Sequence, residues 1–268
     1  MNLLEATSSY WKKKTPFQKA LRGVLFLVVA SLFTAFYFSL PNPIFETSYS
    51  TVLEDRNGIL LGAKIADDEQ WRFPLSEEVP EKFKTAIIEF EDQNFESHFG
   101  VDVFAIARAI QQNYEAGKVV SGASTLSMQV IRLAKNNPDR TVWEKVREMI
   151  QATRLELSYS KDEIMAFYAT HAPFGGNVVG LEAASWRYFG RNPDQLSWAE
   201  TATLAVLPNS PALIHPGRNR SALENKRNRL LKRLNEEQYI DSLTYKLAVM
   251  EPLPDQPLNL PNETPHLT

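Results

Sequence analysis

An uncharged apolar run near the N-terminus constrains this chain more than any other feature of its sequence. Residues Gly23 to Leu40 read GVLFLVVASLFTAFYFSL and include no charged side chain. Such a run is about long enough to cross the apolar core of a bilayer as a helix. Basic residues outnumber acids before it: Lys12, Lys13, Lys14, Lys19 and Arg22 against Glu5. Because basic flanks stay in the cytoplasm, the sequence predicts a single-pass helix with a cytoplasmic N-terminus, and the residues after Leu40 on the other side.

Two other interpretations of this run fit the sequence less well. A cleaved signal peptide needs a small-x-small site, and none precedes the break at Pro41-Asn42-Pro43. A buried helix of a soluble domain would need neither the basic flank nor the uncharged length. The sequence therefore favours an uncleaved transmembrane anchor at 23–40 behind a basic cytoplasmic tail at 1–22.

The composition excludes several classes of protein. Of the 268 residues, 44% are hydrophobic and 23% charged, which is typical of a globular chain and excludes a mostly disordered or collagenous one. The net charge of -3 provides no bulk cationic field, so no nucleic acid is expected as a partner. With 0 Cys the chain has no disulfide, thiol nucleophile or Cys-based zinc site, and with 4 His no His-rich metal cluster is expected.

After the anchor the sequence divides into three further segments. Residues 44–75 read as strands, with the turn DRNG at 55–58 between TVL and ILL and a second turn before WRF. We expect one small β unit there. Residues 76–235 read as helices. Residues 236–268 read as a proline-rich linker, which is typical of a chain that continues into another domain.

Helix signals recur between 76 and 235, where Pro80 precedes the run EKFKTAIIEF. Three Ser or Thr residues have Glu three positions later, the spacing of a capping box: Thr141 with Glu144, Ser160 with Glu163, and Ser197 with Glu200. A mostly apolar stripe at helical spacing follows the first of them: Val142, Val146, Met149, Ile150, Thr153 and Leu157. This stripe predicts a helix side that faces the core.

Two segments carry polar residues in an order that suggests chemistry. Glu91 and Asp92 end an apolar helical run. A carboxylate beside buried apolar groups has a raised pKa and can act as acid or base, although a solvated helix end gives the same pattern. Gly122 leads the run SGASTLSMQ into a helix. Hydroxyls and free amides at such a start either bind an anion such as phosphate or cap the helix.

Three further features each have two interpretations. Lys145 and Glu148 are i,i+3 neighbours, and one interpretation is a surface ion pair. In the other, Lys145 supplies a cation for a phosphate leaving group, and Glu148 supplies a second carboxylate to the site. His171, in the run FYATHAPFGGN, fits a structural role better than a ligand role. The helix VDVFAIARAIQQ at 101–112 fits either a membrane-facing surface or core packing.

Taken together and in this order, the segments resemble the glycosyltransferase domain of class A penicillin-binding proteins, the polymerases of peptidoglycan. The first family motif, E-D-x-x-F-x-x-H-x-G, stands here as Glu91-Asp92, Phe95, His98 and Gly100. The second, G-[AG]-S-T-[IL]-[ST]-x-Q, stands as Gly122 to Gln129. Several spaced motifs in one order make this resemblance specific, where a single one would not.

The other motifs match in part. Lys145 and Glu148 fit R-K-x-x-E, with Glu144 in place of the leading Arg, and a Tyr-Leu-Asn motif stands as Tyr168 followed two residues later by Thr170. The resemblance is closest to the 1C subtype, whose members continue into a transpeptidase domain. The sequence has no Ser-x-x-Lys followed by Lys-Thr-Gly, so penicillin binding is not expected.

The resemblance implies a mainly α, lysozyme-like fold in two lobes, behind the anchor and the small β unit. It implies polymerisation of lipid II, with a growing glycan on undecaprenyl pyrophosphate as donor, into β-1,4 strands with inversion and release of undecaprenyl pyrophosphate. The expected place is the bacterial plasma membrane, with the catalytic domain in the periplasm and membrane lipid and other cell-wall synthesis proteins as partners. No cofactor is required, and Mg²⁺ or Mn²⁺ is a candidate aid at the pyrophosphate.

The resemblance also implies roles for single residues. Glu91 would be the general base, Asp92 would hold the geometry around it, and Glu148 would orient the donor. The implied substrate-binding residues are Lys145, Ser124, Thr125, Gln129, His98, Phe95, Gly122 and Arg140. No metal ligand is among them.

Two alternatives remain at this stage. A lysozyme-like lytic enzyme would cleave the same glycan and would also use a Glu in an α-rich cleft. A membrane-anchored scaffold of the cell-wall machinery, inactive because of Glu144, Thr170 or truncation, would need no catalytic Glu91. The hydroxyl-rich turn and the Lys145/Glu148 pair favour a pyrophosphate donor, which a hydrolase does not need, and the scaffold alternative stays open.

Overall fold

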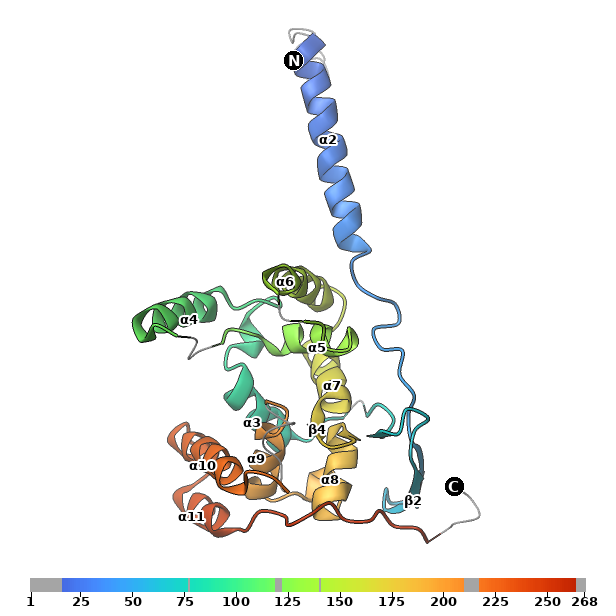
Figure 1. Cartoon of the computed structure of the whole chain (residues 1–268), viewed down its shortest axis with the longest axis vertical. Coiled ribbons are helices and arrows are strands. Elements are labelled where there is room, and N and C mark those ends of the chain that lie inside the picture. The colour runs from blue at the N-terminus through green and yellow to red at the C-terminus, as the bar shows by residue number, and fades with distance from the viewer. Residues whose placement is uncertain (1–15, 77, 119–121, 140, 210–216, 264–268) are drawn as a thin grey trace, which may run out of the picture. The chain divides into compact units, whose positions relative to one another are not determined.

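The computed structural model describes residues 16–76, 78–118, 122–139, 141–209 and 217–263. The chain forms two compact units, Met1–Asn42 and Pro43–Thr268. The described part of the first unit contains α2 (Pro16–Tyr37), a helix of 22 residues drawn in blue in Figure 1. It is the one helix of the described residues that is long and apolar enough to cross a membrane, with a mean hydropathy of 1.9 over its most apolar window. The helix begins before the predicted anchor and includes Lys19 and Arg22.

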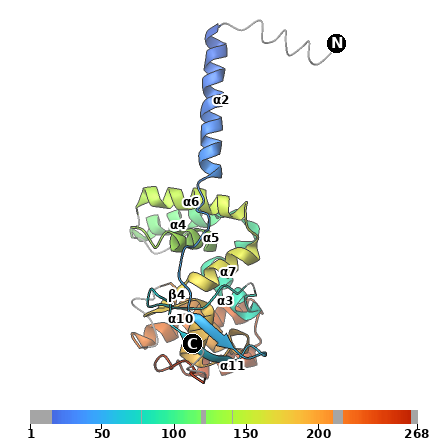
Figure 2. The same ribbon diagram turned by 90° about the vertical axis from the view of Figure 1, so that its right-hand side faces the viewer.

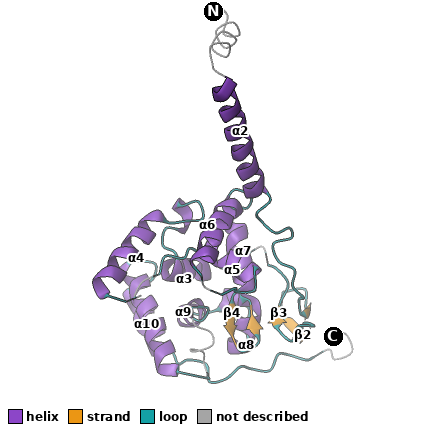
Figure 3. Ribbon diagram, turned by 45° about the horizontal axis from the view of Figure 1, so that its top comes forward, coloured by secondary structure: helices purple, strands orange, loops and turns teal. Residues whose placement is uncertain are grey.

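The second unit is built mainly from helices. Their bounds are α3 (Glu81–Glu91), α4 (Val103–Ala116), α5 (Leu126–Ala134), α6 (Val142–Glu156), α7 (Lys161–His171), α8 (Leu181–Phe189), α9 (Trp198–Val206), α10 (Arg220–Glu236) and α11 (Ser242–Met250), with 3-10 turns at Phe95–Ser97 and Pro193–Gln195. Helix α5 packs against α6 and α7, and α9 packs against α3, α8 and α10. Because α7 contacts both α5 and α8, it joins the two groups of helices, which Figure 3 shows in purple. The prediction of a mainly α fold in two lobes is confirmed.

The predicted β unit is divided between two sheets. Strands β1 (Thr51–Glu54) and β2 (Leu60–Lys64) form the predicted antiparallel hairpin, whose turn is held by Asp55. Strand β3 (Trp71–Arg72) instead pairs in parallel with β5 (Val178–Val179), which also pairs with β4 (Pro173–Gly175). The expectation of one unit within 44–75 is therefore corrected, because the partner strands of β3 lie about a hundred residues further along the chain.

The segment 236–268, predicted as a linker, holds a helix in its first part. Asp241 caps α11 by accepting a hydrogen bond from the Thr244 backbone, over 2.7 Å. The proline-rich part that follows is extended, and Asn262 forms a bridge with Gly62 of β2. The described end of the chain is therefore anchored on the β1–β2 hairpin, whose strands Figure 2 shows face-on, rather than free of the domain.

The capping boxes were predicted correctly at two sites of three. Ser160 with Glu163 and Ser197 with Glu200 form complete boxes at the starts of α7 and α9. At the start of α6, Thr141 accepts from the Glu144 backbone, but the Glu144 carboxylate does not return to it. That carboxylate binds Lys135 and Arg147 instead, because two cations lie within its reach.

The apolar stripe of α6 does not face the core, and that prediction was wrong. The buried side of α6 is formed by Glu148, Ala152 and Leu155, which face α5, whereas Val142 is 84% exposed. Helix α4 also exposes apolar side chains, since Phe104 is 81% exposed and Ala109 is the one buried residue of the helix. The exposed apolar residues of these two helices and the loop before α4 are Phe99, Val103, Phe104, Ile110, Tyr114, Val142, Trp143, Val146, Ile150 and Leu157. Both helices lie at the same end of the second unit (Figures 1 and 2), and we call this set the apolar surface of α4 and α6.

Gly100 allows the loop before α4 to lie against the backbone of α6. Its φ is +84°, and a Cβ atom there would lie 2.5 Å from the carbonyl carbon and oxygen of Ala152. We predict that Gly100→Ala destabilises the fold by about 3 kcal/mol, from left-handed backbone strain plus overpacking against atoms that cannot move aside. Gly117, at φ +63° with nothing within 4 Å, is the matched control, and Gly117→Ala is expected to cost about 1 kcal/mol. Urea unfolding of both variants measures the difference, and equal costs would contradict the packing argument.

Candidate active site

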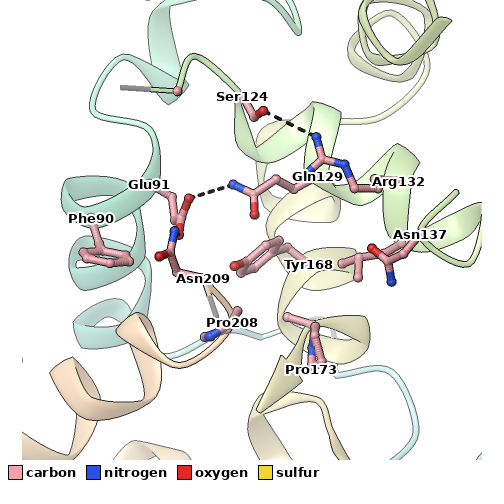
Figure 4. A pocket seen from close by; sticks show the side chains of 13 residues that line it. Phe90, Glu91, Ser124, Gln129, Arg132, Asn137, Tyr168, Pro173, Pro208 and Asn209 are labelled. Atoms are coloured by element: carbon pink, nitrogen blue, oxygen red, sulfur yellow. Dashed lines mark hydrogen bonds between the residues drawn. The ribbon is translucent and has the colours of Figure 1, made fainter. Parts of the chain in front are cut away.

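A polar pocket lies where the end of α3, the start of α5, the end of α7 and the loop after α9 meet. Its volume is about 390 Å³, and Glu91, Ser124, Gln129, Arg132 and Asn209 are among its lining residues (Figure 4). A second hollow of about 410 Å³ also includes Phe90, Glu91, Gly122 and Ser124 in its wall. Glu91 therefore lies at the junction of two openings, so that groups bound on either side can reach it.

Glu91 is the last residue of α3 and is held by two amides. Gln129 Nε2 donates to its Oε2 over 2.9 Å, and Asn209 Nδ2 donates to its Oε1 over 3.3 Å. Burial raises the pKa of Glu91, and the two hydrogen bonds and the charge of Lys226 oppose that rise. A carboxylate that is short of water and has a raised pKa can accept a proton from a bound hydroxyl group.

Asp92 connects the end of α3 to the start of α5. Its Oδ2 accepts a hydrogen bond from the Leu126 backbone over 2.8 Å, and both of its oxygens lie 3.0 Å from His98 Nε2. The Gly100 backbone donates to His98 Nδ1 over 3.1 Å, which leaves the imidazole proton on Nε2, where it donates to Asp92. Thr125, the N-cap of α5, donates its hydroxyl to the Gly100 carbonyl over 2.7 Å. This network brings the first two sequence motifs together.

Not every predicted substrate-binding residue lies at the pocket. Phe95 is buried in the core beneath the Lys161 ammonium, which lies 4.4 Å from the centre of its ring. Phe95 and His98 therefore support the site, and neither is among the lining residues of the two openings. Gly122 lines both openings. Arg140 lies outside the described residues.

Cations gather beside the pocket around Ser124. Lys145 Nζ donates to Ser124 Oγ over 2.6 Å and lies 3.8 Å from Glu148 Oε2. Arg132 donates two hydrogen bonds of 2.8 Å to the two oxygens of Glu148, which is 4% exposed. Arg132 lines the pocket, whereas Lys145 reaches its wall through Ser124. Such paired positive groups suit a phosphate-bearing ligand.

Sequence reasoning missed three residues of this site. Arg132 follows Gln129 at i+3 on α5, so the helical spacing could have placed both on one side of the helix. Asn209 in the loop after α9 and Lys226 in α10 are not among the predicted site residues, and both lie more than a hundred positions along the chain from Glu91. The Tyr168 hydroxyl is also buried at this pocket and has no hydrogen-bond partner among the described residues. Burial and the neighbouring Glu91 raise the pKa of Tyr168, so its hydroxyl keeps its proton.

The described residues do not fit a metal site held by the protein. No group of three or more His, Cys, Asp or Glu residues in the described ranges is placed to hold a metal ion. The carboxylates near the pocket are already engaged, Glu148 by Arg132 and Asp92 by His98. The Mg²⁺ or Mn²⁺ implied by the resemblance stays a prediction, and the proposed reaction does not use it.

Comparison with known proteins gives one matching family, two curated relatives and one solved structure. Residues 59–235 match a family described as Transglycosylase. The chain is 38% identical over 226 residues to "Penicillin-binding protein 1C" of Escherichia coli (strain K12), a match that covers 84% of this chain and 29% of that protein. It is 35% identical over 248 residues to "Penicillin-binding protein 1A" of Aquifex aeolicus (strain VF5), covering 88% of this chain and 34% of that protein. A crystal structure of Penicillin-Binding Protein 1A from Haemophilus influenzae matches with a TM-score of 0.44 and 21% identity, over 80% of this chain and 22% of that chain. The chain spans about a third of the length of the curated relatives it matches.

The Arg132–Glu148 pair predicts a measurable stability effect. We expect Arg132→Met to destabilise the fold by about 3 kcal/mol, because it leaves a buried carboxylate without its main partner. The double variant Arg132→Met/Glu148→Gln should recover part of that loss, since no buried charge then remains. Lys145→Met is the control, with an expected cost of about 1 kcal/mol, because the ammonium is partly exposed and its contact with Glu148 is long. Urea unfolding of the wild type, the single variants Arg132→Met and Glu148→Gln and the double variant gives the coupling energy, and additive losses would contradict a coupled pair.

Proposed function

Because the chain belongs to the transglycosylase family, we propose that it is a peptidoglycan glycosyltransferase that polymerises lipid II. In this reaction a growing glycan on undecaprenyl pyrophosphate is the donor and lipid II is the acceptor. The observation that carries the proposal is that Glu91 and Arg132 line one pocket, with Lys145 bound to Ser124 in its wall. The pocket thereby combines a base, which can remove a proton, with a cationic site for the departing phosphate.

The proposed chemistry follows from this arrangement. Glu91 takes the proton from the 4-hydroxyl of the acceptor N-acetylglucosamine. The hydroxyl oxygen then attacks the anomeric carbon of the donor N-acetylmuramic acid, and the bond from that carbon to the pyrophosphate breaks. The pyrophosphate leaves with the bonding electrons, and its charge is stabilised by Arg132 and Lys145. Attack on the face opposite the leaving group turns the α-linkage into a β-1,4 bond.

The pKa of Glu91 supports the role of base. Proton transfer is most efficient when the pKa of the base approaches the working pH, and burial raises the pKa of Glu91 in that direction. Gln129 and Asn209 limit the rise by donating to the charged form. The raised pKa makes the Glu91 carboxylate a stronger base than an exposed glutamate.

The apolar surface of α4 and α6 supports a substrate that carries a long lipid. A soluble domain rarely leaves so many large apolar side chains in water, and Phe104 and Tyr114 are 81% and 88% exposed. Helix α6 also supplies Lys145 and Glu148 to the site. We propose that this surface enters the outer interface of the plasma membrane, with α2 as a single-pass anchor, the N-terminus in the cytoplasm and the second unit in the periplasm.

A lytic enzyme is supported less well by the same geometry. Most glycosidases use two carboxyl groups that flank the scissile bond, one of them a free acid. Here Glu148 receives two hydrogen bonds from Arg132, and Asp92 receives hydrogen bonds from His98 and the Leu126 backbone. Both carboxylates are engaged by protein donors, so neither is free to act as the second carboxyl group beside Glu91. Thr170, which stands in place of a family Asn, is buried and is not among the residues that line either opening.

The catalytic role of Glu91 can be tested on the full chain with labelled lipid II. We expect the wild type to form glycan polymer and release lipid pyrophosphate, and Glu91→Gln to lose about 10²–10⁴-fold in rate, because the general base is removed. Glu96→Gln, which changes an exposed carboxylate five positions along, is the control and should keep its rate. Cleavage of finished glycan without polymer would support the lytic alternative, and unchanged activity of Glu91→Gln would contradict the mechanism.

The membrane contact can be tested without background because the chain contains 0 Cys. We expect a nitroxide label at Phe104→Cys or Val142→Cys, in the full chain reconstituted into vesicles, to collide more with oxygen than with a polar nickel complex, since oxygen concentrates among acyl chains. A label at Lys232→Cys, on the exposed side of α10, is the control and should show the reverse order. Electron paramagnetic resonance measures both accessibilities, and aqueous values at all three positions would overturn the proposed contact.

A further inference from the structure

Lys226 of α10 is connected to Glu91 through a single amide. Lys226 Nζ donates to Asn209 Oδ1 over 2.7 Å, and Asn209 Nδ2 donates to Glu91 Oε1 over 3.3 Å. An ammonium group has donors only, so it can bind only the oxygen end of the Asn209 carboxamide. Contact with Lys226 thus fixes the orientation in which the Asn209 NH₂ group faces Glu91. With the amide turned over, two oxygens would face each other.

The charged and titratable groups around Glu91 come from four helices. Asp92 follows it directly after α3, Arg132 lies on α5, Tyr168 on α7 and Lys226 on α10. Arg132 gives two hydrogen bonds to Glu148, so much of its charge is compensated there, and Tyr168 is neutral. The negative charge of Asp92 opposes ionisation of Glu91. Lys226 is therefore a cation whose charge favours the ionised form of Glu91.

Lys226 is suited to this role by its own surroundings. Its side chain is half-buried, and burial lowers the pKa of Lys226 while the attraction of Glu91 raises it. Within the described ranges no carboxylate forms a salt bridge with Lys226. Its hydrogen-bond partner Asn209 is neutral, so this contact does not cancel the charge of Lys226.

We propose that Lys226 is a positioning residue for the general base: through Asn209 it fixes the direction of one hydrogen bond to Glu91, and its charge keeps the Glu91 carboxylate ionised. The inference rests on the proposed function, since it concerns the same site. It assigns a role in the reaction to α10, which contains none of the sequence motifs. Lys226 contacts no reacting atom in this assignment.

The first test measures Glu91 directly and needs no enzymatic activity. The full chain, in detergent, carries glutamate labelled with ¹³C at the carboxyl carbon, and the Glu91 signal is identified by its loss in Glu91→Gln. We expect Lys226→Met to raise the pKa of Glu91 by about one unit, because the ionised form loses a nearby positive charge. Lys226→Arg keeps the charge and the donors and should stay within about 0.3 units of the wild type. Lys232→Met, which removes an exposed charge from the same helix, should leave the titration unchanged.

The second test measures the pH profile of lipid II polymerisation with the same variants. The base must be ionised to act, so a raised pKa of Glu91 moves the acidic limb of kcat to higher pH, and we expect a shift of about one pH unit for Lys226→Met only. Thermal unfolding of each variant shows that the fold is kept, since methionine retains the apolar stem.

The outcomes separate the two proposals. An unshifted Glu91 titration in Lys226→Met, or the same shift in Lys226→Arg and Lys226→Met, overturns the role of Lys226 whether or not polymer forms. A shifted titration in a chain that forms no polymer supports the Lys226 contact and overturns the proposed function. A lower rate of Lys226→Met with an unmoved acidic limb indicates a purely structural role and also overturns the inference.

Discussion

The hydrogen bonds of Asp92 hold this site together. The carboxylate accepts hydrogen bonds from the Leu126 backbone N–H at the start of α5 and from His98 Nε2, so separating the end of α3 from the start of α5 would break a hydrogen bond to a buried charge. Glu91 precedes Asp92, and Gln129 follows Leu126 by nearly one helical turn. Fixing Asp92 therefore also fixes the distance over which Gln129 donates to Glu91. A neighbour that does no chemistry itself determines where the base lies.

The parts of this structure that could be predicted from the sequence are those that depend on near neighbours in the chain. The turn at Asp55 is held by hydrogen bonds to residues within four positions of it, and the capping boxes at Ser160 and Ser197 join residues three positions apart. The pairing of β3 with β5 depends on residues about a hundred positions apart, and no local pattern reports it. Asn209 and Lys226 escaped prediction for the same reason, since only the packing of α9 and α10 on α3 brings them to Glu91.

The error at α6 has a different cause. Apolar residues at helical spacing indicate that one side of a helix avoids water, but they do not say whether protein or lipid covers that side. On α6 the side that packs on α5 is formed by Glu148, Ala152 and Leu155, and the apolar residues lie elsewhere on the helix. One side of α6 thus supplies polar residues to the site, and another side exposes apolar residues. The proposed function, which acts on a lipid-linked substrate, would use both sides of this helix.

The charges at the pocket are arranged before any ligand arrives, and this has a cost. Burying Glu148 and Arg132 is favourable only because two parallel hydrogen bonds join them, and that geometry also holds the guanidinium plane still at the pocket wall. A fixed cation does not need to reorganise when negative charge develops on a leaving group, which is the main advantage of such a site over water. Glu144 extends this pattern outward, because it occupies Lys135 and Arg147 and leaves the pocket to Arg132 and Lys145. Glu144 stands where the family motif has Arg, and it also restrains two cations, so under the proposed function binding of the pyrophosphate would depend more heavily on Arg132 and Lys145.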